Sequence, residues 1–173
     1  MISESAAFIA LNKQLVNESD YLMLLPAEAD ISIETQTEMT RSMRQNNLAN
    51  VYVAQSNGLL VGYIGVTPVR FAKNKHCCQF AIGVLKSHQR KAIGTKLIQA
   101  MEQWAAAQAI FRIELSVVVD NVAAIAFYQR CGYHVEGTKT ASLKIENGFV
   151  DEFLMAKLII STTESSLKKS PVE

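Results

Sequence analysis

A strand, a short polar turn and a helix follow one another near the middle of the chain, and this order constrains the fold most strongly. The apolar run 80–84 predicts a buried strand. Beyond Gly94, mostly apolar side chains recur at the spacing of an amphipathic helix. These positions are Leu97, Ile98, Met101, Trp104, Ala105 and Gln108. A strand that passes through a tight turn into a helix directs the free amides of the first helical turn at whatever lies above it.

The turn has the composition of an anion site. Arg90, Lys91 and Lys96 supply mobile cations, while Ala92 and Gly94 are small. Unpaired amides and the helix dipole favour a phosphate group at such a position. The spacing matches neither the phosphate loop of nucleoside triphosphatases nor the glycine fingerprint of dinucleotide dehydrogenases. A pyrophosphate held by a different kind of loop is therefore predicted.

A second strand and helix follow this unit. The β-branched run 112–119 predicts a buried strand. Asp120 or Asn121 is placed to cap a helix that ends near residue 131, with Gly132 as its stop. Asn121, Ala124, Ile125 and Tyr128 share one helical face. Taken singly, such a tyrosine is usually a core residue and such an asparagine only a cap.

Together the two segments resemble the GNAT superfamily of N-acetyltransferases. Residues 89–94 resemble its acyl-CoA pyrophosphate loop, Gln/Arg-x-x-Gly-x-Gly/Ala, with Ala92 at the first glycine. We expect alanine to be tolerated there at helical dihedral angles. Residues 121–133 resemble the motif Asn-x-x-Ala-x-x-x-Tyr-x-x-x-Gly-Phe, with Tyr133 at the last position. The likeness covers about residues 12–160 and is strongest to a bacterial branch that acts on small amines and amino acids.

This resemblance implies an α/β (α+β) fold, with a mixed, mostly antiparallel sheet flanked by helices on both faces. It also implies an N-acetyltransferase that uses acetyl-CoA as cosubstrate, without a metal, and that transfers the acetyl group by direct attack in a ternary complex. Tyr128 would be the general acid facing the CoA sulfur, and Asn121 would contact the pantetheine arm. The implied cofactor-binding residues are Ile82, Gly83, Val84, Gln89, Arg90, Lys91, Ala92, Ile93, Gly94, Thr95, Asn121 and Tyr128.

The general base and the acceptor stay open at this stage. Glu114 shares a strand face with Ser116, so it either activates the amine or pairs with Arg112. Weaker alternatives are His76, Glu18 and a relay of ordered water. Acidic residues before the second helix would suit a polyamine, whereas arginines would suit the carboxylate of an amino acid; these residues are Glu18, Asp20, Glu28, Arg41 and Arg44. Alternative functions are a non-catalytic acyl-CoA-binding regulatory module and a peptide or ribosomal-protein N-terminal acetyltransferase.

Composition limits the remaining classes. The 173 residues are 49% apolar, with a net charge of +1, which predicts one domain at 1–160 and a disordered tail at 161–173. A near-neutral charge gives no field for nucleic acid, and no segment predicts a membrane span or signal peptide, so we expect a cytoplasmic protein. Its partner would be a small amine, and a homodimer is left open. The three cysteines and three histidines fit neither a disulfide framework nor a metal site.

The rest of the chain predicts helices at about 5–16 and 32–46 and hairpin strands at 50–55 and 60–69. A further strand is expected at 76–84, a short strand after Gly132, and a last hairpin around 147–148 that leads into a strand at 149–160. The usual first strand of the family is not recognisable.

Overall fold

The elements follow the predicted order. The computed structural model describes residues 2–45, 50–146 and 148–159. In this part of the chain the elements are α1 (Ile2–Glu18), α2 (Ile33–Gln45), β1 (Asn50–Ser56), β2 (Leu59–Pro68), β3 (Cys77–Val84), the 3-10 helix η1 (Lys86–His88), α3 (Ile93–Ala107), β4 (Arg112–Val118), α4 (Val122–Arg130), β5 (His134–Ile145) and β6 (Gly148–Leu158). No strand precedes α1 within these ranges. Asn147 of the predicted last turn and the predicted tail lie outside them.

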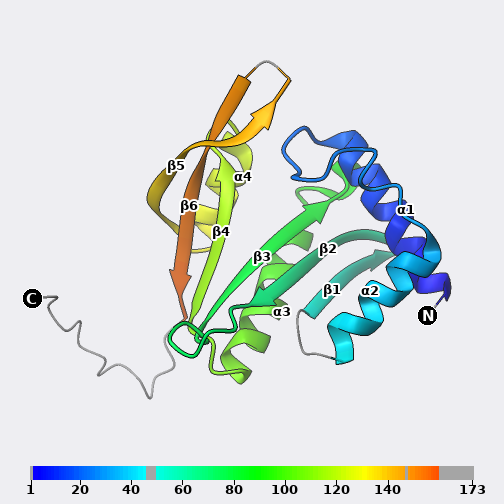
Figure 1. Ribbon diagram of the computed structural model, residues 1–173, viewed down its shortest axis with the longest axis horizontal. Helices are drawn as coiled ribbons and strands as arrows, with labels where there is room; N and C mark the ends of the chain where they lie inside the picture. Colours follow the sequence, from blue (N-terminus) through cyan, green and yellow to red (C-terminus); the bar gives the residue numbers. More distant parts are fainter. Residues whose placement is uncertain (1, 46–49, 147, 160–173) are drawn as a thin grey trace, which may run out of the picture.

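The predicted mixed sheet is confirmed. Six strands lie in the order β1-β2-β3-β4-β6-β5, and every neighbouring pair is antiparallel except β3 with β4 (Figure 1). The strand after Gly132 is longer than predicted, since β5 has 12 residues. It pairs with β6 through two irregularities in register, and the two strands form a long arm (Figure 1). Strands are predicted from an alternation of apolar and polar residues. Most side chains of β5 are exposed, so this alternation is lacking and the sequence pattern underestimates the length of the strand.

Helices cover both faces of the sheet, as predicted. α3 and α4 pack on one face, where Met101 and Ile98 meet Ile113 and Met155 in the main core. On the other face α1 contributes Leu11 and Leu15 to a second cluster with Val61 and Leu85. Figure 1 shows α1 and α2 in front of the half formed by β1–β3, and no helix in front of β4 and β6. No helix of the described ranges is long and apolar enough to cross a membrane.

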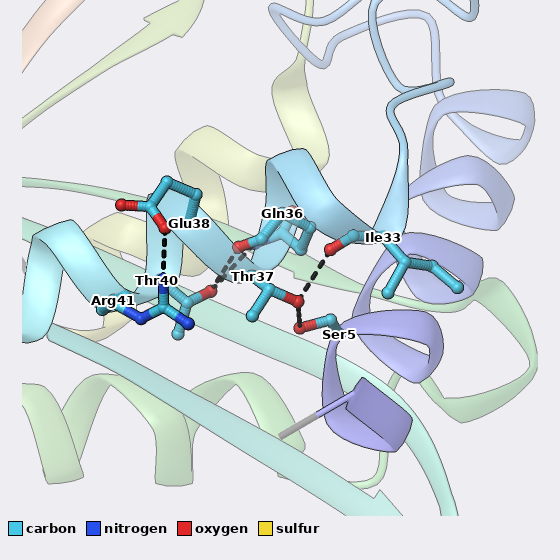
Figure 2. Close-up of polar contacts among 7 residues, drawn as sticks. All are labelled: Ser5, Ile33, Gln36, Thr37, Glu38, Thr40 and Arg41. Atoms are coloured by element: carbon cyan, nitrogen blue, oxygen red, sulfur yellow. Dashed lines mark hydrogen bonds and ion pairs between the residues drawn. The ribbon is translucent and has the colours of Figure 1, made fainter.

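The second helix is attached through the first. Figure 2 shows Thr37 of α2 bonded to the buried hydroxyl of Ser5 on α1 at 2.9 Å and to the carbonyl oxygen of Ile33 at 2.7 Å. Buried hydroxyl groups need such partners, because an unpaired one costs free energy. One turn further, Arg41 forms an ion pair with Glu38 at 2.5 Å (Figure 2). Arg41 is therefore engaged within its own helix, and the side chain of Arg44 lies outside the described part.

Two glycines of β2 differ in the space around them, and this predicts different stabilities. A Cβ at Gly62 would lie 2.8 Å from the carbonyl oxygen of Gly83, whereas one at Gly65 would meet only a Tyr63 ring carbon at 3.9 Å. We expect Gly62→Ala to lower the free energy of unfolding by about 1–3 kcal/mol, since backbone must move. Gly65→Ala should leave it unchanged or raise it by up to about 1 kcal/mol. Urea denaturation measures both, and equal losses would contradict this account.

Candidate functional site

The central parallel strands separate after a short paired segment. Residues Cys77–Gln79 of β3 pair with Arg112–Glu114 of β4, and no register pair joins the two strands beyond these in the described chain. β3 nevertheless continues to Val84, so the edge of residues 80–84 is open toward β4 (Figure 1). Backbone amides and carbonyls at such an edge need partners. The predicted contacts Ile82, Gly83 and Val84 lie on this open edge, where an amide-bearing ligand would supply the missing hydrogen bonds.

The loop after β3 has an unusual backbone. Arg90 and Ala92 both have φ of 59°, in the left-handed region that L residues rarely adopt. The expectation of right-handed helical angles at Ala92 was therefore wrong. Its position in the family is written as glycine because glycine adopts positive φ without strain. Two side chains hold the loop: Gln89 Nε2 donates to the Val84 carbonyl at 3.0 Å, and Lys91 Nζ donates to that of Ser87 at 2.9 Å.

The start of α3 presents free donors, as predicted. No side chain caps this helix end, and its first bond runs from the Lys96 amide to the Ala92 carbonyl at 3.0 Å. Among the described residues, the amides of Ile93, Gly94 and Thr95 have no acceptor. Three parallel donors at the positive end of a helix form a site for a phosphate group.

Gly94 has a packing role in addition to its predicted place in the loop. A Cβ at this position would lie 3.0 Å from Cζ of Phe127 on α4. The absence of a side chain therefore lets α3 and α4 approach closely, which brings the loop next to the helix that carries Tyr128. A large residue at Gly94 would press on Phe127 and disturb the fold, so it is unsuitable as a test of phosphate binding.

Tyr128 lies beside the open edge. Its ring packs edge-on against Phe80, the first residue of the open segment, with centroids 5.9 Å apart, and against Tyr133 at 6.3 Å. Burial raises the pKa of Tyr128 to about 12, and its hydroxyl has no hydrogen-bond partner in the described chain. The phenol is therefore protonated at neutral pH and free to donate. Seven residues earlier, Asn121 Oδ1 accepts from the Ala124 amide at 3.1 Å, which leaves its side-chain NH₂ free.

Glu114 forms the pair with Arg112 that the sequence left open as one interpretation, and it lies where the two central strands separate. It is the last β4 residue paired with β3, at the point where the strands separate. Its carboxylate also accepts from Arg112 Nε at 2.5 Å, and Arg112 is bonded in turn to Glu136 of β5. The hydrogen bond that Arg112 donates to Glu136, followed by its contacts with Glu114, raises the pKa of Arg112 above its ordinary value. Glu114 is thus both beside the open edge and part of an ion-pair network.

The weaker base candidates are engaged elsewhere. Glu18 Oε2 accepts from the Lys86 amide at 2.7 Å and Oε1 accepts from Gln14 at 2.9 Å, so its carboxylate holds the start of η1. His76 stacks on Phe111, with ring centroids 4.6 Å apart, at the end of β3 remote from the loop. Glu18 contributes to the site through the position of the loop, a role that the sequence analysis did not identify.

The cysteines carry no evident chemistry here. All three are free, and Cys77 and Cys78 are buried. Burial raises the pKa of Cys78 to about 12 and also raises that of Cys131. Such thiols stay protonated and are poor nucleophiles. Within the described ranges, no three His, Cys, Asp or Glu residues gather as a metal site would require.

Comparison with known proteins gives a consistent result. A model of the Acetyltransferase (GNAT) family matches residues 19–133, more than half of the chain. L-amino acid N-acetyltransferase AaaT of Escherichia coli (strain K12) is 28% identical over 110 residues, which are 61% of this chain and 66% of that protein. The match thus spans slightly less than two thirds of this curated relative.

Solved structures have the same fold. A GNAT acetyltransferase from Streptococcus pneumoniae is 25% identical with a TM-score of 0.83, and the likeness covers 91% of this chain and 95% of that one. The yncA protein of Salmonella typhimurium, solved with its cofactor acetyl-CoA, has a TM-score of 0.79 at 16% identity, over 99% of this chain and 94% of that one.

Because Ala92 is exposed, substitutions at this position can test the loop without disturbing the packing of the core. Asp and Asn both tolerate left-handed angles, so Ala92→Asp and Ala92→Asn differ mainly in charge. We expect Ala92→Asp to weaken acetyl-CoA binding by about 10-fold or more relative to Ala92→Asn, because a carboxylate repels phosphate at short range. Titration calorimetry measures both affinities, and equal values for two folded variants would remove the pyrophosphate from this loop.

Proposed function

The chain belongs to the acetyltransferase (GNAT) family, and we propose that it transfers an acetyl group from acetyl-CoA to a small primary amine. One observation carries this proposal: the open edge of β3 leads directly to the free amides of α3, with Tyr128 beside the start of that edge. An extended ligand with amides in the middle and a pyrophosphate at one end fits this path. The relative named for L-amino acids supports a small amine as the acceptor.

Different residues along this path are proposed to bind different parts of acetyl-CoA. We assign the pyrophosphate to the amides of residues 93–95 and to the cations of Arg90 and Lys91. Gln89 would hold the loop in place through its hydrogen bond to the Val84 carbonyl. The edge at residues 82–84 and the free amide of Asn121 would hold the pantetheine arm. Acetyl-CoA supplies an activated acetyl thioester when bound. Fixing that group at one place turns attack by the amine into an effectively unimolecular step.

Tyr128 and Glu114 are proposed to move the protons. As the new N–C bond forms and the C–S bond breaks, Tyr128 Oη gives its proton to the leaving sulfur. The acceptor amine must first be neutral, and an alkylammonium pKa near 10 leaves only about one part in a thousand in that form at pH 7. Glu114 is proposed to take the amine proton, directly or through water, from its place at the start of the separation between β3 and β4.

The role of Tyr128 predicts a specific loss. Tyr128→Phe keeps the ring against Phe80 and removes only the donor. We expect kcat to fall by about 10- to 1000-fold, with little change in acetyl-CoA affinity. Tyr133→Phe is the matched control: it removes a hydroxyl that donates to Glu102 at 3.3 Å in the same aromatic group. This control should change stability more than kcat, and a wild-type rate for Tyr128→Phe would return Tyr128 to a packing role.

The role of Glu114 predicts a pH-dependent loss. We expect Glu114→Gln to depress the rate most at low pH, where little free amine exists, and the deficit to shrink as pH rises toward the amine pKa. Glu136→Gln removes the other carboxylate from Arg112 and should give a deficit that does not vary with pH. Initial rates of thiol release, measured from about pH 6 to about pH 10, compare the two variants. Parallel profiles for both would leave Glu114 as an ion-pair partner only.

A further inference from the structure

We propose that Lys139 and Ser116 bind the carboxylate of the acceptor, so that the acceptor is a free amino acid. This inference rests on the proposed acetyl transfer to a small amine and specifies its substrate class. It begins with one contact: Lys139 Nζ on β5 donates to Ser116 Oγ on β4 at 2.7 Å, across the intervening strand β6.

Both residues lie on the sheet face opposite α3 and α4. Ile113, Leu115 and Val117 of β4 point into the main core, so Ser116 points to the other face, as Glu114 does. On β5, Lys139 stands opposite Glu152, which stands opposite Val118 of β4. The pair therefore lies just beyond the point where β3 and β4 separate, on the part of the sheet that no helix covers (Figure 1).

Lys139 forms no ion pair with the described carboxylates on this face, although Glu152 stands opposite it on the neighbouring strand. Arg112 is engaged by Glu114 and Glu136. Glu152 is buried, and its Oε2 accepts from the Ser142 hydroxyl at 2.6 Å. In the described chain Lys139 makes no ion pair, and its bond to Ser116 is to a neutral hydroxyl. An exposed cation that reaches a side chain of β4 can bind an anionic group of the substrate.

The hydroxyl completes a two-donor site. Ser116 Oγ accepts from Lys139 and so keeps its own proton to donate. An ammonium and a hydroxyl side by side suit the two oxygens of one carboxylate, and charge-assisted bonds of this kind are the stronger ones. The site selects against polyamines, because a second ammonium group would lie next to Lys139.

The spacing along β4 suits a small molecule. Ser116 is two residues beyond Glu114, which corresponds to about 7 Å along a strand. An amine near Glu114 and a carboxylate near Ser116 can therefore belong to a single α-amino acid, with a hydrogen bond at each end. A peptide N-terminus carries an amide instead of this carboxylate, so it would lack the matching group.

The experiment compares an amino acid with the same molecule after its carboxylate is neutralised. We would measure thiol release from acetyl-CoA with L-methionine, L-methionine amide and spermidine. We expect the wild-type chain to prefer the free amino acid in kcat/KM. Lys139→Met should raise KM for L-methionine by about 10- to 100-fold while kcat and the KM for acetyl-CoA stay near wild type, and Lys139→Arg should restore most of the affinity.

The control is Lys144→Met, the same change at an exposed lysine on the same strand, which should leave every constant unchanged. Equal use of the amide or of spermidine by the wild-type chain would overturn the carboxylate site while leaving acetyl transfer to amines in place. A uniform loss on all acceptors in Lys139→Met would also overturn it. An absence of thiol release with every acceptor, including a peptide panel, would overturn the proposed function and this inference with it.

Discussion

The limited pairing of β3 with β4 is the constraint on which the rest of the structure depends. Three residues of each strand are joined, and the strands then separate. On one side of the separation, Cδ1 of Leu15 of α1 lies 2.8 Å from the position that a Cβ of Gly83 would take. On the other side Phe127 and Tyr128 of α4 pack toward Gly94 and Phe80. Packing on both faces therefore keeps a strand edge open in the middle of a sheet, where an unpaired edge would otherwise be costly.

The elements of this site could be predicted because their signals are local. The strand before Val84, the helix after Gly94 and the helix between Asn121 and Gly132 each have their own periodicity and caps, and all three form as predicted. The order of these elements is also what predicts a phosphate-binding loop after β3. Side chains four and seven residues apart lie on one face of a helix whatever the rest of the fold does, so Asn121 and Tyr128 could be assigned to one face from sequence alone.

What could not be predicted depends on contacts between distant segments. The bond between Glu18 and the Lys86 amide joins residues 68 positions apart, and that between Lys139 and Ser116 depends on the register of three strands. The left-handed angle at Ala92 is a property of the closed loop and is invisible to residue type, because alanine is a helix former. Gly94 shows the same limit, since its close approach to Phe127 of α4 depends on the packing of two separate helices.

The two contacts of α1 with the β3 end have a consequence for how the protein responds to its ligands. Leu15 touches the strand at Gly83, and Glu18 holds the amide that starts the loop, so one helix contacts both β3 and the proposed pyrophosphate loop. Suppose that binding of one ligand shifts this helix and thereby changes the affinity for a second ligand. The second ligand then changes the affinity for the first by the same factor, because linkage is reciprocal. A substitution in α1 that moves Leu15 or Glu18 is therefore expected to disturb both β3 and the loop after it, so it would not change one without the other.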